Sequence, residues 1–238
     1  MIRMFIGSCL ILSLLCGCSS IRSAPKYAFS NGYYKAKVFS PGPATVYVNN
    51  EEDFVLVYPV TKKGNLTMID TSLHAPLALP QQFTETSGKA YVFHIHSFDI
   101  DFLTIPFKYR PKVGELPRQF NAHLSGGLYL GYRNDSYVIK YQRDPMGRSS
   151  RRTTHFGFSV GGFSGIGGAA MNPWVTNDAI AIEYDGLIWT KGVASIIGLD
   201  QITLGLALGW DHLLDNNKRV WLYQGKPWVG LVFGLNLN

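Results

Sequence analysis

Two histidines one residue apart are the first residues whose spacing suggests chemistry. His94 and His96 fall in a segment rich in Val, Ile and Phe, and alternate residues of a strand share one face at about 7 Å by strand rise. Two imidazoles can hold a metal ion when a third ligand joins them, and Asp99 and Asp101 follow closely. No motif places such a third ligand. We therefore interpret the four residues as polar positions facing water or a lumen, and expect no metal site and no cofactor.

Serine, glycine and carboxylate patterns are equally weak as catalytic signals. Gly162-Phe163-Ser164-Gly165 lacks the G-x-S-x-G spacing of a serine nucleophile, and Gly161 to Gly168 lacks the Lys-Ser/Thr that follows a phosphate loop. Five acidic residues could supply a catalytic carboxylate pair, but nothing fixes the distances among them; they are Asp99, Asp101, Glu183, Asp185 and Asp211. We predict that the protein is not an enzyme and has no catalytic residue.

The basic residues concentrate at one place. Arg148, Arg151 and Arg152 could pair with lipid phosphates if their loop lies at a membrane surface, or could form a solvated charged loop. The remaining charge, +6 in total, is diffuse. No zinc-finger, helix-turn-helix or RNP-like pattern accompanies it, so we exclude nucleic acid as a partner.

The first residues form a processing signal. Arg3 precedes an apolar run, Phe5 to Leu15, that is too short for a transmembrane helix. The run ends in Leu15-Cys16-Gly17-Cys18, which resembles the lipobox of bacterial lipoproteins. That resemblance implies that residues 1–17 are removed and that Cys18 is acylated. An ordinary secretory signal is the alternative.

The cysteines and the next residue agree with a lipid anchor. Cys9 and Cys16 lie in the removed peptide, so the mature chain keeps only Cys18 and forms no internal disulfide. Each acyl chain contributes about 0.8 kcal/mol of membrane binding per buried CH₂. By resemblance to lipoproteins of Gram-negative bacteria, Ser19 after the cysteine favours the outer membrane.

Alternation with a period of two dominates the second half of the chain, and 46% hydrophobic residues with 25 glycines suit a β-rich protein. Within the last 38 residues, Gln201 to Asn238, two segments alternate large apolar side chains with small or polar ones, so one face of each expected strand is apolar. The pattern recurs in Asn121 to Arg133 and in Phe156 to Gly161. A soluble sheet buries such a face, whereas an outer-membrane barrel turns it towards lipid.

The segment from Lys89 to Asn238 resembles small outer-membrane β-barrel proteins. The resemblance rests on its glycine-alternating strands and on aromatic residues near the expected strand ends, Trp210, Trp221, Tyr223 and Trp228. It implies an antiparallel barrel of about eight strands, and seven or eight strand candidates follow Lys89. From their residue types, Asn134-Asp135 should form a tight turn and residues 220–223 should extend the last hairpin. Many such barrels end in an aromatic residue, whereas this chain ends in Asn238.

The chain therefore divides into a signal peptide (1–17), a tether (18–32), a small N-terminal β unit with a linker (33–88) and an antiparallel β-barrel (89–238). Thr45 to Val48 and Phe54 to Tyr58 should form a hairpin that packs on something else, because a lone hairpin is marginal in water.

The predicted function is that of a non-enzymatic outer-membrane lipoprotein with a structural, envelope or adhesive role. It contacts membrane lipid through acylated Cys18 and through the apolar barrel face. The alternative is a soluble lipocalin-like or β-sandwich lipoprotein that binds a small apolar ligand. The two hypotheses differ in which face of the strands is covered by the protein itself.

Overall fold

The structure, a computed structural model, describes residues 28–63, 66–70, 76–83, 89–199 and 202–235. Its described residues form an all-β protein whose strands belong to antiparallel pairs. Two short 3-10 turns, η1 (Trp174–Thr176) and η2 (Asn216–Arg219), interrupt the strands. Within these ranges, no helix has the length and apolar character needed to cross a membrane.

The strands fall into an N-terminal group and a C-terminal group, and most strands of the C-terminal group are longer. The N-terminal group contains β1 (Gly32–Ala36), β2 (Ala44–Asn50), β3 (Phe54–Lys63), β4 (Leu66–Ile69), β5 (Leu77–Pro80) and β6 (Gln82–Phe83). The C-terminal group contains β7 (Tyr91–Arg110), β8 (Gln119–Asn121), β9 (Ser125–Arg143), β10 (Ser149–Met171), β11 (Tyr184–Leu199), β12 (Ile202–Leu213) and β13 (Pro227–Leu235).

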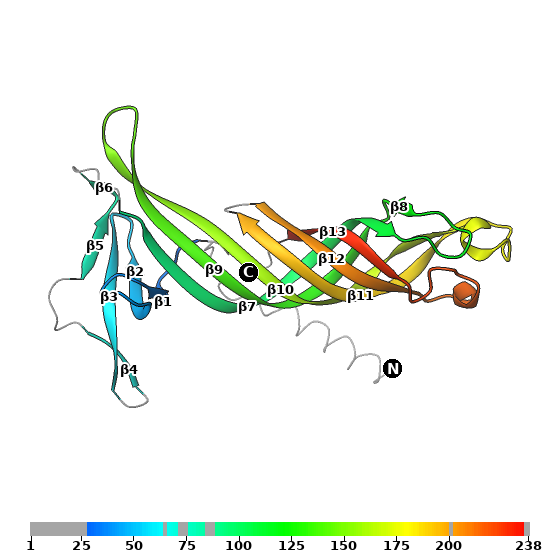
Figure 1. The fold of residues 1–238 in the computed structure, drawn as a ribbon, viewed down its shortest axis with the longest axis horizontal. Helices are drawn as coiled ribbons and strands as arrows, with labels where there is room; N and C mark the ends of the chain where they lie inside the picture. The colour runs from blue at the N-terminus through cyan, green and yellow to red at the C-terminus, as the bar shows by residue number, and fades with distance from the viewer. Residues whose placement is uncertain (1–27, 64–65, 71–75, 84–88, 200–201, 236–238) are drawn as a thin grey trace, which may run out of the picture.

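Six of the long strands pair around a ring. Neighbours pair in the order β7, β9, β10, β11, β12 and β13, and β13 pairs back with β7. We call these six strands the strand ring. Figure 1 shows the ring as an elongated body with β1 to β5 at one end, the proximal end, and β8 and η2 at the other, the distal end.

The N-terminal strands cover the proximal end of the ring through an apolar core. β2 and β3 form the predicted hairpin, and β1 joins their sheet to β7 through Lys35 opposite His94 and Ala36 opposite Phe93. Val46, Val48, Val55 and Val57 pack in one cluster with aromatic side chains that include Phe93 of β7 and Tyr137 of β9. The prediction that this hairpin packs on another element is confirmed.

The number of ring strands differs from the prediction, since the described residues form six rather than about eight. One cause is Asn134-Asp135, where the sequence predicts a turn and β9 instead runs straight through from Ser125 to Arg143. Asp135 pairs with Ile95 on one side and with Gly157 on the other, and its buried carboxylate contacts Arg133 and His155. These interactions outweigh the local turn preference of Asn and Asp.

The glycine-rich stretch and the last predicted strand extension also differ. Gly162 to Gly168, whose boundaries could not be assigned from the sequence, lies within β10. Residues 220–223 do not extend the final hairpin. They follow η2, a turn in which Asp215 accepts a hydrogen bond from the Asn217 amide at 2.8 Å, and they place Trp221 and Tyr223 in a buried cluster at the distal end.

Inward-facing glycines let the strands of the ring approach one another. A side chain on Gly161 would meet the backbone of Leu130 on β9, and one on Gly209 would meet the indole of Trp228 on β13. The interior is therefore narrow, and large side chains at these inward positions would not fit.

Candidate functional site: an apolar belt around a polar interior

The outward-facing side chains of the strand ring are mostly apolar and exposed. On β12 the leucines of the predicted apolar face, Leu204, Leu206 and Leu208, point outward with 46%, 58% and 42% of their surfaces exposed. The other ring strands contribute further exposed apolar residues, which include Phe98, Ile100, Phe102, Leu128, Leu130, Phe156, Phe158, Val160, Ile166, Val193, Ile197, Val229, Leu231 and Phe233. We call this set the outer belt.

Aromatic residues lie at both ends of the outer belt. At the proximal end, the ring of Tyr132 stacks on His96 with centroids 5.8 Å apart. Near the distal end, the ring centroids of Trp189 and His212 are 5.5 Å apart, and Trp189 Nε1 donates a hydrogen bond to Ser164 Oγ at 2.9 Å. The ammonium group of Lys191, a charged residue on the outer face, lies 4.3 Å from the Trp189 ring. Amphipathic aromatic rings of this kind are typical of the interface between lipid and water.

Charged side chains occupy the proximal half of the interior. Arg133 Nε donates to Asp135 Oδ2 at 2.7 Å, and Arg133 Nη1 lies 3.4 Å from Asp99 Oδ1. His155 Nε2 lies 2.8 Å from Asp135 Oδ1. Asp99, Asp135 and His155 are each at most 3% exposed. The four residues form a proximal charged cluster in which every member has an oppositely charged or hydrogen-bonding neighbour.

Aromatic side chains fill the middle of the interior. Tyr129, Phe163 and Trp228 are buried in one cluster with Leu103, Ile105 and small residues from β11 and β12. The Tyr129 hydroxyl lies 2.7 Å from Ser159 Oγ. Side chains therefore occupy the centre of the ring, as expected in a barrel with few strands.

A second group of charges lies towards the distal end. Lys108 Nζ donates to both Asp211 oxygens at 3.1 Å, and Arg110 Nη2 also donates to Asp211. The Lys108 ammonium lies 4.5 Å from the Trp228 ring, and the Arg110 guanidinium lies 5.0 Å from the Tyr223 ring. Burial raises the pKa of the Tyr223 hydroxyl, although the nearby Arg110 acts in the opposite direction. We call Lys108, Arg110 and Asp211 the distal charged cluster.

The structure separates the residues that resembled a metal site. His94 Nδ1 lies 2.8 Å from Ser136 Oγ and His96 stacks on Tyr132, whereas Asp99 and Asp101 are buried on the opposite face of β7. Among the described residues, no group of three or more metal-ligating side chains is close enough to bind an ion.

The other sequence candidates also lie apart from one another. Ser164 lies on the outer face, Glu183 and Asp185 are exposed, and Asp211 is in the interior. Cys18, the predicted lipidation site, lies outside the described residues.

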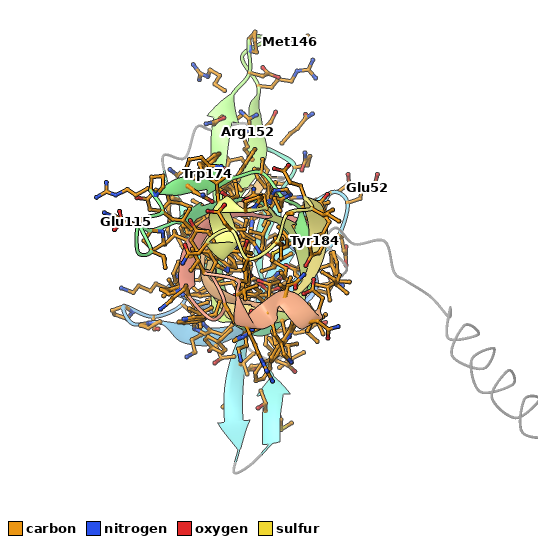
Figure 2. All side chains as sticks on the ribbon, turned by 90° about the vertical axis from the view of Figure 1, so that its right-hand side faces the viewer. Glu52, Glu115, Met146, Arg152, Trp174 and Tyr184 are labelled. Carbon is orange, nitrogen blue, oxygen red and sulfur yellow. The ribbon has the colours of Figure 1, made fainter. Side chains whose placement is uncertain are left out.

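The arginine cluster lies at the proximal end, on the hairpin between β9 and β10. In Figure 2 this hairpin, with Met146 at its tip and Arg152 below, projects away from the ring. Arg151 is half-buried and donates to Leu79 O at 2.6 Å, so it joins the hairpin to β5. Arg148 and Arg152 are exposed.

Sequence reasoning missed most of the buried charges, namely Lys108, Arg110, Arg133, Asp135 and His155. A signal was available, because Arg133 and Asp135 continue the parity of the inward glycines Gly127 and Gly131. Charged residues on the small face of an alternating strand can therefore indicate a polar interior.

Comparisons with protein-family models, with curated proteins and with solved structures find no match to this chain.

Proposed function

We propose that this protein is a non-enzymatic lipoprotein of the bacterial outer membrane whose strand ring is embedded in the bilayer. The observation that carries the proposal is the inverted polarity of the ring, which exposes the leucines, isoleucines and phenylalanines of the outer belt and buries lysine, arginine and aspartate. A protein in water gains free energy by the reverse arrangement. A membrane β-barrel needs this one.

The length of the belt fits a bilayer. On β10 the outward apolar residues extend from Phe156 to Ile166, which lie opposite Leu199 and Trp189 of β11. A strand tilted at about 45° needs about 9–11 residues to cross the hydrocarbon layer. Trp189 and Lys191 fit the headgroup region, where a lysine can extend its ammonium group towards water.

The proximal end of the ring fits the side of the membrane that would hold the lipid anchor. The tether predicted at residues 18–32 leads into β1, so an acylated Cys18 would lie in the leaflet nearest the N-terminal strands. The exposed Arg148 and Arg152 are at the same end and could contact headgroup phosphates of that leaflet. The role that we propose for the protein is structural or adhesive. The N-terminal strands and the distal loops would make the contacts that this role needs.

The soluble alternative is less consistent with the geometry. A lipocalin-like or sandwich protein would hold its leucines in a core or around an apolar cup. Here Leu204, Leu206 and Leu208 of β12 are exposed, and aromatic side chains fill the centre of the ring.

The test removes the lipid anchor and asks whether the ring still holds the protein in the membrane. A Cys18→Ala variant with an exchanged secretory signal is expected to resist carbonate extraction from outer membranes. Release of folded, soluble variant would contradict the embedding of the ring. A matched variant that also carries Leu206→Arg and Leu231→Arg in the outer belt should lose this resistance, which would show that the belt is the second anchor.

A further inference from the structure

A small polar pocket opens at the distal end of the strand ring, outside the belt. It has a volume of about 220 Å³ and lies between β8 and the end of β10. β10 pairs with β9 only as far as Gly167 opposite Ser125, and its last residues pair with β11 instead, for example Met171 with Tyr184. β8 pairs with β7. Beyond Gly167, β10 is therefore no longer paired with β9, and the pocket lies next to this gap.

Arg110 lies at the inner side of this pocket with part of its hydrogen-bonding capacity unused. The residue is 2% exposed, and its Nη2 donates to Asp211. Its Nε and Nη1 are buried and have no hydrogen-bond partner, and neither has the hydroxyl of Tyr223, which also lines the pocket. Because a buried donor without a partner destabilises the protein, and more so when it is charged, this arrangement calls for an acceptor.

The distal charged cluster also has an excess of positive charge. Lys108 and Arg110 share the single carboxylate of Asp211, so one cationic charge stays uncompensated in a buried setting. A neutral acceptor such as water would satisfy the free N–H groups, but only an anion would also balance this charge.

The rim of the pocket suits a small oxyanion. Gln119, Asn121, His123 and Asn172 provide polar groups and are partly exposed, so the pocket is open to solvent. Ala169 and Ala170 leave space on the β10 side. A guanidinium N–H that donates to a carboxylate or phosphate oxygen forms a charge-assisted hydrogen bond, which is stronger than a neutral one.

We propose that this pocket binds an oxyanion, with Arg110 as its charged partner. The ligand is either a free small anion or the phosphate of a lipid headgroup, since both present the same oxygens. Binding here does not depend on the embedding of the ring, because the pocket lies beyond the outer belt.

The first experiment measures binding to the full chain in an uncharged maltoside detergent by isothermal titration calorimetry at constant ionic strength. The probes are inorganic phosphate, acetate and short-chain dihexanoyl phosphatidic acid. Arg110→Gln should weaken binding at least tenfold, whereas Arg118→Gln, which removes an exposed charge close by in the sequence, should not. Binding of the phosphatidic acid alone would identify a lipid headgroup, and binding of the small anions would identify a free ligand.

The second variant keeps the test decisive if Arg110→Gln does not fold. Gln119 lies directly opposite Arg110 on β8 and lines the same pocket, so Gln119→Glu places a built-in carboxylate beside the guanidinium. This variant should lose binding of all three probes and should melt at a higher temperature than the wild type without ligand. If the wild type binds none of the probes, or if Arg110→Gln or Gln119→Glu binds them as tightly as the wild type, the proposal is wrong.

Discussion

The N-terminal strands and the strand ring use the same alternation in opposite ways. In β2 the apolar residues Val46 and Val48 are buried, whereas in β12 the apolar Leu204 and Leu206 are exposed and the small Gly205 and Ala207 are buried. The N-terminal sheet is open, so the extended ends of β7 and β9 can cover its apolar face. The ring closes on itself, and its narrow interior accepts only the face with small residues.

Two strands belong to both regions and show how the change occurs. On β7 the inward face passes from Phe93, in the N-terminal core, to Asp99 and Asp101 and then to Leu103. The parity of the buried face is unchanged over this stretch, while its chemistry alternates between apolar and charged layers. The two regions therefore differ in which face of their strands is covered by the rest of the protein. Variants on each face can test this difference.

The largest effect is expected from the ring's buried charges. Asp211→Asn would leave Lys108 and Arg110 buried without a carboxylate, and removing one partner of such a pair costs about 3–5 kcal/mol. The free energy of unfolding, measured in urea with the protein in detergent, should fall by that amount. Glu52→Gln, at an exposed site of the N-terminal region, is the control and should change it by less than about 0.5 kcal/mol. Equal effects at both sites would show that the charged interior does not stabilise the ring.

The outer belt should tolerate charge less well than an exposed N-terminal site. Leu206→Arg should destabilise the protein by about 2–4 kcal/mol in phospholipid vesicles, because arginine at a lipid-facing position loses its hydration. Thr67→Arg on β4, also an exposed position, should be near neutral under the same conditions. Unfolding curves in vesicles compare the two variants, and a near-neutral Leu206→Arg would mean that the belt faces water.

Two adjacent glycines on β10 lie on opposite faces of the strand, Gly161 on the inner face and Gly162 on the outer face. A Cβ on Gly161 would collide with the carbonyl of Leu130, so Gly161→Ala should cost about 1–3 kcal/mol. On Gly162 the nearest atom to a Cβ is Gly192 O at 3.7 Å, which is an ordinary contact. Gly162→Ala should stabilise the ring by about 0.4–1 kcal/mol. Thermal unfolding of both variants tests the assignment of faces, which would be wrong if the order of stabilities were reversed.

These faces are the part of the fold that the sequence can predict. The alternation in the last two strands matches the structure, because a period of two needs only local information. The pairing of the interior charges could not be predicted, since Lys108 meets Asp211 only after the ring closes. The sequence predicts a turn at Asn134-Asp135 because the local preference of these residues is visible in it and their partners on β7 and β10 are not.

The smallest effect concerns Tyr34 in the N-terminal core. Its hydroxyl donates to Ser30 O at 2.8 Å, so Tyr34→Phe should cost about 1 kcal/mol at neutral pH. Burial raises the pKa of this tyrosine above its ordinary value of about 10. Below that pH both the folded and the unfolded states keep the proton, and the contribution of Tyr34 to stability is constant.

At higher pH the unfolded state loses the Tyr34 proton first, so the stability that Tyr34 contributes falls as the pH rises towards its folded pKa. Subtracting the Tyr34→Phe curve removes the titration of the other tyrosines. Hydrogen exchange of the β2 amides reports local opening of the N-terminal strands, whose core contains Tyr34. The difference between wild type and variant should therefore be constant below about pH 10 and shrink above it. An unchanged difference would mean that Tyr34 ionises equally in both states, and that the N-terminal core does not exclude water from this hydroxyl.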